Sequence, residues 1–350
     1  MRKRRLWAAA IGAILPLFFS FPAKGAEAKA YAVLDLFTGE FTAENRSDEA
    51  LPGASTAKIM TALVAAEEGE LSKRIPILPE DAAEEGSRAY LQPGEEPTLE
   101  ELLEALLLAS GNDAASAVAR GVGGSREEFI KMMNRKAEEL GLENTRYENP
   151  SGLDGERQFT TARDLARLAA AAMENETVAR LLGTKYASFG GHVLKNHHRL
   201  LFEETGCVAG KTGFTKKAGR CLVSVFERKG RRAVVVTLAD PDDWRDHRAL
   251  ADGFFREVEE VKLAFSFPIR TLDFQKEEGE LLGEASLPLR PGEREKLSFT
   301  AEADHFLWRL PCEGEETGLF RITLAGRTVS QGRLFFHALP PRAFLQGKKG

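Results

Sequence analysis

Leu51-Pro-Gly-Ala-Ser-Thr-Ala-Lys-Ile-Met-Thr-Ala-Leu63 is the stretch of this chain that decides its fold. Apolar residues recur at helical spacing from Ile59 to Val64, which predicts a helix that begins at or next to Ser55. Lys58 follows three residues after Ser55, and on a helix this spacing places both side chains on one face. The small residues before Ser55 and the apolar ones after Lys58 indicate that the helix start is buried.

Ser55 and Lys58 are residue types that can serve as a nucleophile and its general base. A serine hydroxyl is a poor nucleophile at neutral pH and needs a base within hydrogen-bonding distance. A lysine that is buried near another cation loses its proton more readily, so Lys58 could be that base, with Lys211 as the second cation. Taken alone, a Ser-x-x-Lys string occurs by chance about once in such a chain, and a helix cap next to a surface cation is the alternative.

Two more short motifs follow in the chain, Ser110-Gly-Asn112 and Lys211-Thr-Gly213. Each has a simple alternative, because the first could end a helix and the second could form a turn between strands. The lysine motif begins a stretch that reads as an edge strand, where a glycine leaves room for a substrate to approach and pair with the backbone. Together and in this order the three motifs are much rarer than each one alone, and they favour a catalytic site.

The surrounding residues carry a family resemblance. Asn149-Pro-Ser-Gly-Leu-Asp154 and Thr161-Ala-Arg-Asp-Leu-Ala166 accompany the three motifs. With them the chain resembles the serine-type D-alanyl-D-alanine carboxypeptidases, the low-molecular-mass penicillin-binding proteins, over roughly residues 29–262. The resemblance implies removal of the terminal D-alanine from peptidoglycan stem peptides through an acyl-enzyme. It also implies inhibition by β-lactam antibiotics, without a cofactor or a metal.

The same resemblance assigns a role to each matching residue. Ser55 would be the nucleophile, Lys58 the base and Ser110 a proton shuttle to the leaving amine. Asn112 would bind the substrate backbone, since an amide offers both a donor and an acceptor. Binding of the terminal carboxylate would fall to the residues of the predicted strand, Lys211, Thr212, Gly213 and Thr215, and the backbone N–H groups of Ser55 and Phe214 would form the oxyanion hole.

Three positions differ from the family pattern or remain open. Gly206-Cys-Val-Ala-Gly210 precedes Lys211 where the family often has an aspartate and a bulky apolar residue. Ser151 replaces a histidine found in some members, which leaves the deacylating water without an obvious side-chain partner in that loop. Arg245 falls near a family arginine, and a solvated arginine at a helix start is an equal alternative.

Two rival functions use the same motifs. A class A β-lactamase shares the trio, but it needs a glutamate within a Glu-x-x-Leu-Asn loop, and Glu148 here lacks that setting. Ser-Gly-Asn in place of Ser-Asp-Asn also disfavours a β-lactamase. A catalytically silent peptidoglycan-binding protein is the second rival, and the three intact motifs argue against it.

The pattern of strands and helices predicts an α/β (α+β) fold. Strands are expected at residues 29–37, 220–227 and 232–238, and amphipathic helices at residues 99–109, 126–140 and 161–173. Early and late strands would form one mainly antiparallel sheet flanked by helices, as in the β-lactamase/transpeptidase-like domain. We expect this catalytic domain over residues 27–262 and a small all-β domain over residues 265–350.

The two ends of the chain predict where it acts. Residues 1–25 have the basic, apolar and small-residue order of a secretory signal peptide, with a retained anchor as the alternative. Its removal takes five basic residues and moves the net charge from −5 to −10, which argues against a nucleic-acid partner. The protein is therefore expected to be exported and extracytoplasmic. Pro340-Pro341 breaks any C-terminal amphipathic helix, so contact with a membrane surface would lack a clear C-terminal anchor.

Cysteine and histidine usage predicts no metal site. Cys207, Cys221 and Cys312 are too few and too scattered for a disulfide framework or a zinc site, although the first two could form a bridge. The six histidines, among them the adjacent His197 and His198, show no metal-ligand spacing.

Overall fold

The structure is a computed structural model that describes residues 26–270, 278–303 and 311–338. The expected signal peptide, residues 1–25, and the last twelve residues lie outside this range. The described chain forms two compact units that divide between Arg256 and Glu257. This division falls a few residues before the domain boundary expected from the sequence.

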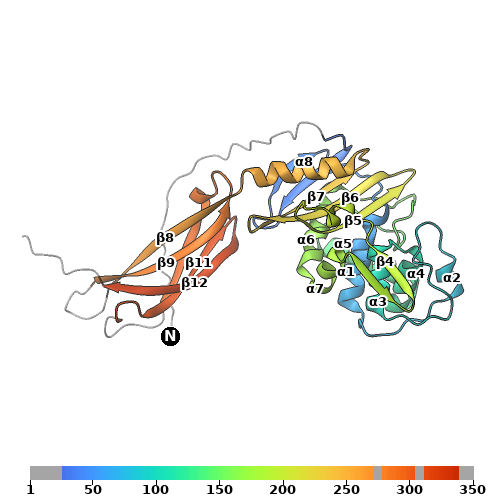
Figure 1. Ribbon diagram of the computed structural model, residues 1–350, viewed down its shortest axis with the longest axis horizontal. Coiled ribbons are helices and arrows are strands. Elements are labelled where there is room, and N and C mark those ends of the chain that lie inside the picture. Colours follow the sequence, from blue (N-terminus) through green and yellow to red (C-terminus); the bar gives the residue numbers. More distant parts are fainter. Residues whose placement is uncertain (1–25, 271–277, 304–310, 339–350) are drawn as a thin grey trace, which may run out of the picture. The chain divides into compact units, whose positions relative to one another are not determined.

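The first unit is built around a five-stranded sheet with the order β2-β1-β7-β6-β5 (Figure 1). The N-terminal part of the chain supplies β1 (Ala30–Asp35) and β2 (Phe41–Asn45). The other three strands come from late in the unit: β5 (Cys207–Thr215), β6 (Gly219–Arg228) and β7 (Arg231–Leu238). Each neighbouring pair is antiparallel, and β5 lies at one edge. The prediction of one sheet from both ends of the domain is confirmed.

Helices cover the sheet, and their packing explains the composition of its central strands. α6 (Ala162–Glu174) packs on β1 and β7, and α8 (Asp243–Arg256) packs on β6 and β7 (Figure 1). β7 has buried side chains on both faces of the sheet, since seven of its eight residues are buried. A strand covered on both faces has a near-continuous apolar run rather than an alternating one, as Ala233 to Val236 has.

The remaining helices of the unit form a lobe between β2 and β5. α1 (Lys58–Glu68) lies at its centre and contacts α3 (Leu99–Leu108), α4 (Asn112–Gly123) and α5 (Arg126–Glu139). The lobe also holds the short α2 (Pro79–Ala82) and α7 (Glu176–Gly183). The helices predicted at residues 99–109, 126–140 and 161–173 are present within one or two residues of these limits.

Side-chain caps fix where several of these helices begin. Thr161 accepts a hydrogen bond from the backbone N–H of Asp164 at the start of α6. Ser125 accepts one from the backbone N–H of Glu128 at the start of α5. The Glu128 carboxylate binds Lys131, so Ser125 is a cap without the reciprocal bond that the sequence pattern suggested.

A small two-stranded hairpin precedes the edge strand. It consists of β3 (Tyr186–Phe189) and β4 (His192–Lys195), which pair antiparallel. A 3-10 turn, η2 (Arg199–Phe202), follows the hairpin and contacts β5. The sequence patterns did not predict this hairpin, because its strands have only four residues each.

The second unit is an antiparallel sheet with the order β10-β11-β12-β9-β8, preceded at β10 by a 3-10 turn, η3 (Arg294–Lys296). Its strands are β8 (Glu259–Arg270), β9 (Glu278–Leu289), β10 (Ser298–Ala303), β11 (Glu316–Leu324) and β12 (Arg327–Ala338). Phe265 on β8 packs 5.0 Å from Phe299 on β10, measured between ring centroids. The rings of these two edge strands touch, so the sheet curls around an aromatic core. The expected all-β character of this region is confirmed.

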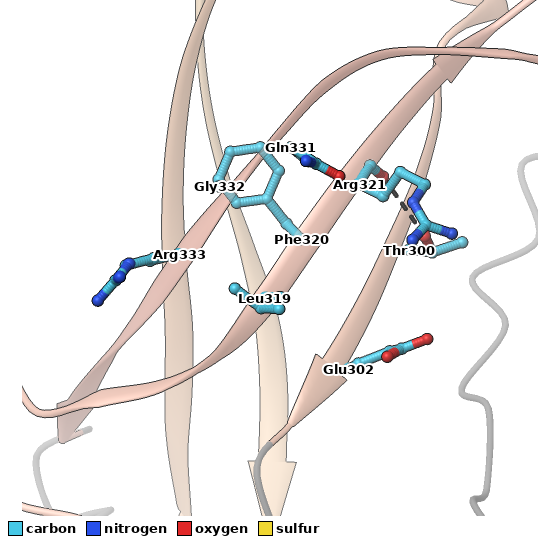
Figure 2. A pocket seen from close by; sticks show the side chains of 8 residues that line it. All are labelled: Thr300, Glu302, Leu319, Phe320, Arg321, Gln331, Gly332 and Arg333. Atoms are coloured by element: carbon cyan, nitrogen blue, oxygen red, sulfur yellow. Dashed lines mark hydrogen bonds between the residues drawn. The ribbon is translucent and has the colours of Figure 1, made fainter.

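The outer surface of this second sheet has a hollow of about 280 Å³ across β10, β11 and β12 (Figure 2). Glu302, Leu319 and Arg333 are paired across the three strands and therefore share one face. Gly332 leaves space that the Phe320 ring occupies, since a Cβ at this position would lie 2.6 Å from that ring.

The cysteines do not form a bridge. Cys207, Cys221 and Cys312 are all free. Cys207 is opposite Phe226 and Cys221 is opposite Gly213, so the two lie far out of register on neighbouring strands. Within the described ranges, no helix is long and apolar enough to cross a membrane, and no group of acidic, histidine or cysteine residues could hold a metal ion.

Candidate active site

Ser55 lies in a single 3-10 turn, η1 (Ala54–Ala57), that leads directly into α1. The turn begins with Ala54 at a φ of 48°, a left-handed conformation that is unfavourable for a residue with a side chain. Lys58, the first residue of α1, has its Nζ 2.9 Å from the Ser55 Oγ. The predicted nucleophile and base are therefore within hydrogen-bonding distance, with Ser55 one turn before the α-helix.

Lys58 is completely buried among oxygen atoms. Besides Ser55, its Nζ donates to the Asn112 Oδ1 at 2.7 Å and to the backbone carbonyl of Ser151 at 2.5 Å. Burial lowers its pKa well below the usual value, and the charge of Lys211 lowers that pKa further. A lowered pKa favours the neutral amine, which is the form that can act as a base.

The second motif connects α3 to α4 on the other side of the nucleophile. Ser110 has a φ of 58°, and its Oγ accepts a hydrogen bond from the Nζ of Lys211 at 3.0 Å. Asn112 begins α4 and binds Lys58 through its oxygen, while its amide nitrogen donates to the backbone carbonyl of Glu85 at 2.5 Å. A side-chain amide carries two N–H donors, so one of them remains for a substrate.

The third motif lies on β5, and its lysine points inward. Lys211 is 1% exposed and donates to the backbone carbonyl of Thr212 at 3.0 Å as well as to Ser110. Burial lowers the pKa of Lys211 to about 7. Of the other predicted strand residues, Thr212 is partly buried, and the Thr215 hydroxyl donates to Asp154 at 2.8 Å.

Gly213 is the position where β5 approaches the nucleophile most closely. A Cβ there would lie 2.9 Å from the carbonyl oxygen of Gly53 and 3.1 Å from the backbone nitrogen of Ser55. The glycine therefore makes room for the η1 turn, whereas the sequence suggested room for a substrate. Phe214, whose backbone N–H is expected to join that of Ser55 in an oxyanion hole, is the next residue along β5.

Gln158, which no sequence motif contains, and Asn149, the first residue of the Asn149–Asp154 motif, hold the 148–154 loop against Lys58. Gln158 accepts hydrogen bonds from the backbone N–H groups of Glu148 and Asn149 at 2.8 and 2.9 Å. Asn149 in turn accepts from the backbone N–H of Gly152 at 2.8 Å. These bonds fix the loop that presents the Ser151 carbonyl. In the sequence, Gln158 is a polar residue shortly before a predicted helix. That pattern does not distinguish it from an ordinary surface residue.

Asp113 is a further residue missed at the sequence level. Its carboxylate is inaccessible and accepts hydrogen bonds from the backbone N–H groups of Ala89 and Leu91 at 3.0 and 3.1 Å. The loop that precedes α3 is thereby tied to the residue next to Asn112. Its position directly after Ser-Gly-Asn was the only sequence signal.

Arg245 and His198 have structural roles. Arg245 is at the start of α8 and forms ion pairs with Glu27 and Asp246 at 3.1 and 3.0 Å, which fits the alternative of a solvated arginine at a helix start. His198 is buried with its Nε2 2.9 Å from the Ser224 Oγ. Burial is the main cause that lowers its pKa to about 4, so it remains neutral near neutral pH.

The sequence matches the family model described as D-alanyl-D-alanine carboxypeptidase over residues 19–242. It is 36% identical to the D-alanyl-D-alanine carboxypeptidase DacF of Bacillus subtilis over 220 residues, which cover 60% of this chain and 57% of DacF. It is 30% identical to DacC of Escherichia coli over 334 residues, 88% of this chain and 83% of DacC. The chain thus spans somewhat more than half of the first relative and most of the second.

Solved structures show the same fold. A D-alanyl-D-alanine carboxypeptidase from Mycobacterium tuberculosis superposes with a TM-score of 0.65 at 33% identity, covering 70% of this chain and 96% of that one. DacD from Francisella tularensis superposes with a TM-score of 0.66 and covers 93% of this chain and 96% of its own. At 23% identity this second likeness concerns the fold alone.

Proposed function

The chain belongs to the D-alanyl-D-alanine carboxypeptidase family, and we propose that it removes the terminal D-alanine from peptidoglycan stem peptides through an acyl-enzyme on Ser55. The observation that carries the proposal is the convergence of three distant segments. Lys58 binds Ser55 and Asn112, and Lys211 binds Ser110, so all three motifs meet in one hydrogen-bonded site.

Acylation begins with attack of the Ser55 Oγ on the carbonyl carbon of the penultimate D-alanine. Neutral Lys58 takes the hydroxyl proton over the 2.9 Å contact as the new C–O bond forms. Negative charge develops on the carbonyl oxygen, and the backbone N–H groups of Ser55 and Phe214 stabilise it. A preorganised donor of this kind lowers the activation free energy by about 3 kcal/mol.

Ser110 and Lys211 complete the step at the leaving group. The Ser110 hydroxyl relays a proton to the amine of the departing D-alanine, and the Lys58 ammonium supplies that proton. The charge of Lys211 stabilises this relay, since its Nζ lies 3.0 Å from the Ser110 Oγ. The C–N bond breaks and leaves an ester on Ser55, which water then hydrolyses.

Substrate binding uses the open edge of the sheet. β5 pairs with β6 on one side, and no described strand pairs with its other side. An extended stem peptide can add to this edge as a further strand through main-chain hydrogen bonds. Lys211, Thr212 and Thr215 offer a cation and hydroxyl groups for the terminal carboxylate, and Asn112 offers its remaining N–H.

The structure disfavours the β-lactamase alternative at Glu148. A class A β-lactamase uses its loop glutamate to activate the deacylating water. Here the Glu148 carboxylate accepts hydrogen bonds from the backbone N–H and the Nε of Arg157, at 2.9 and 3.0 Å. The same contacts lower its pKa, which makes Glu148 a weaker base.

The proposal extends to inhibitors and to the place of action. Penicillin carries a carboxylate and a reactive amide in the arrangement of the D-Ala-D-Ala terminus, so it is expected to acylate Ser55 and to leave slowly. The substrate is found in the cell wall, so the protein would act outside the cytoplasm, in agreement with the export signal expected at residues 1–25.

One experiment separates the candidate functions. The purified protein and its Ser55→Ala variant are mixed with a fluorescent penicillin, and the bound label and the released D-alanine from a peptide ending in D-Ala-D-Ala are followed in time. A stable label and D-alanine release, both lost in the variant, support the carboxypeptidase. Rapid turnover of the penicillin would favour a β-lactamase, and absence of both signals would leave only a silent binding protein.

A further inference from the structure

The β3–β4 hairpin carries an exposed group of aromatic, apolar and basic side chains outside the catalytic centre. We name it the hairpin patch and define it as Lys185, Tyr186, Val193, Lys195 and Phe202. The large apolar members are 60%, 82% and 38% exposed, in the order Tyr186, Val193 and Phe202. A cluster of exposed large apolar side chains is uncommon on a free surface and is typical of a binding site.

The patch has one defined face. Tyr186 is paired with Lys195 across the hairpin, so their side chains share the outward face. The ring of Phe202, from η2, meets the ring of Tyr186 edge to face with centroids 5.5 Å apart. The two aromatic rings and the strand pairing hold the face in one shape without a bound ligand.

The two charged members of the hairpin patch, Lys185 and Lys195, are both positive. The Nζ atoms of Lys195 and Lys185 lie 5.2 and 5.9 Å from the centroid of the Phe202 ring. Among the described residues no carboxylate pairs with either lysine. Two ammonium groups on one ring repel each other, and an anion bound between them would offset that repulsion. The whole chain has a net charge of −5, so this positive face is a local exception that favours an acidic ligand.

Short hydrogen-bonded segments join the patch to the catalytic centre. Asn196, the residue after β4, donates its backbone N–H to the carbonyl of Lys185 at 2.9 Å. His197 donates its backbone N–H to the carbonyl of Leu108, two residues before Ser110, at 3.2 Å. The segment that follows the hairpin thus lies against the end of α3, which leads to Ser110.

We propose that the hairpin patch is a second binding surface for the polymeric substrate, next to the catalytic centre. The ligand is a chain of sugar rings that carries peptide carboxylates. Its sugar rings stack on Tyr186 and Phe202, and its carboxylates pair with Lys185 and Lys195. The inference rests on the proposed function, because only an enzyme acting on peptidoglycan meets this polymer as its substrate. The link to the Ser110 segment favours this ligand over an acidic membrane.

The test compares polymer binding with cleavage of a short substrate. The variant combines Tyr186→Ala, Lys185→Gln and Lys195→Gln in the full chain. Sedimentation with purified, insoluble peptidoglycan should show binding weakened about tenfold, because one stacking contact and two ion pairs are lost. Release of D-alanine from a soluble tripeptide, and acylation by penicillin, should stay within about twofold of the wild type.

The control removes the same charge elsewhere. Lys262→Gln with Lys296→Gln changes two exposed lysines of the second unit and should keep wild-type binding. Unchanged polymer binding of the patch variant, an equal loss in the control, or an equal loss of tripeptide cleavage would each overturn the proposal. So would loss of binding to phosphatidylglycerol vesicles with retained binding to peptidoglycan. Wild-type protein that cleaves no tripeptide would instead refute the proposed function itself.

Discussion

Lys58 and Lys211 are two buried lysines of one site, and the charge of Lys211 is a cause, second to burial, of the low pKa of Lys58. The charge of Lys211 thus adds to the effect of burial and favours the neutral form of Lys58. Lys211 binds Ser110, and Lys58 binds Ser55, so each lysine contacts one serine. In the proposed mechanism, Lys58 takes the Ser55 proton, and Ser110 passes a proton to the leaving amine.

The first prediction concerns pH. Acylation by penicillin should follow a bell-shaped pH curve. At low pH Lys58 becomes protonated and cannot accept the Ser55 proton. Above the pKa of Lys211, about 7, that lysine loses the charge that attracts the ligand carboxylate. The measurement is the second-order rate constant of acylation between about pH 4 and pH 10.

Lys211→Arg provides the control for this curve. A guanidinium keeps its charge throughout the range, so the decrease on the alkaline side should disappear while the acidic side remains. Only the shape of the curve is compared, because the larger side chain also changes the absolute rate. If the acylation rate of this variant still decreases on the alkaline side with the midpoint of the wild type, the proposed role of Lys211 is wrong.

The second prediction concerns the approach of β5 to the nucleophile. Gly213→Ala places a Cβ 2.9 Å from the Gly53 carbonyl oxygen and should push β5 away from η1. The backbone donors at Ser55 and Phe214 then separate, and acylation should slow about a hundredfold. Fluorescent-penicillin labelling measures the rate, and thermal unfolding checks that the fold remains.

Gly253→Ala is the matched control. Gly253 lies within α8 and has no heavy atom near the place of an added Cβ. Alanine favours helix, so this variant should be as stable as the wild type or more stable by up to about 1 kcal/mol. Its acylation rate should not change. Equal rates for the two glycine variants would show that the contact at Gly213 does not matter.

The third prediction concerns the 148–154 loop. Gln158→Ala removes the acceptor of two backbone N–H groups, which costs about 1–3 kcal/mol of stability. The Ser151 carbonyl should then hold Lys58 less firmly, and acylation should slow. Thermal unfolding and acylation rates are measured on the same samples.

The neighbouring Arg157→Ala tests whether the effect is specific. The Arg157 side chain is 71% exposed, and its ion pair with Glu148 should contribute at most about 1 kcal/mol. This variant should acylate at the wild-type rate. If both variants behave alike, the hydrogen bonds of Gln158 have no special part in positioning the loop.

The fourth prediction concerns stability away from the site. Asp35 on β1 and Arg231 on β7 form an ion pair in which neither side chain is exposed. Asp35→Ala leaves the buried guanidinium without this carboxylate and should cost about 3–5 kcal/mol. Asp252→Ala breaks the more exposed pair with Arg228 and should cost at most about 1 kcal/mol. Chemical denaturation measures both, and a similar small cost for the two variants would refute the prediction.

The sequence predicts a contact in the catalytic centre where both of its residues belong to one short motif. The spacing of Ser55 and Lys58 fixes their distance, because residues three apart on a helical turn share a face. The glycine of the Lys211 motif favoured an edge strand at β5, and the hairpin of β6 and β7 was clear from two β-branched runs around a turn. These features depend on neighbours in the sequence or on strand patterns that are long enough to recognise.

The remaining contacts depend on tertiary structure. Asp113 binds two backbone N–H groups about two dozen residues earlier in the chain, and Gln158 binds a loop that has no regular pattern. The left-handed φ angles of Ala54 and Ser110 are enforced by their surroundings and run against local preference. The β3–β4 hairpin has strands too short for a periodic signal. These contacts, backbone angles and short strands therefore could not be predicted from a single sequence.

The sheet of the first unit also decides when this protein can act during its own synthesis. β1 pairs with β7 in the centre of the sheet, with Asp35 opposite Ala233. Until residues 231–238 have left the ribosome, the first strand has no central partner, and the β5–β6 pair that carries Lys211 has no sheet to join. Such long-range pairing forms late and slowly. A nascent chain that already carries Ser55 and Lys58 is thus inert, and penicillin would find no target on it until the whole unit has been made.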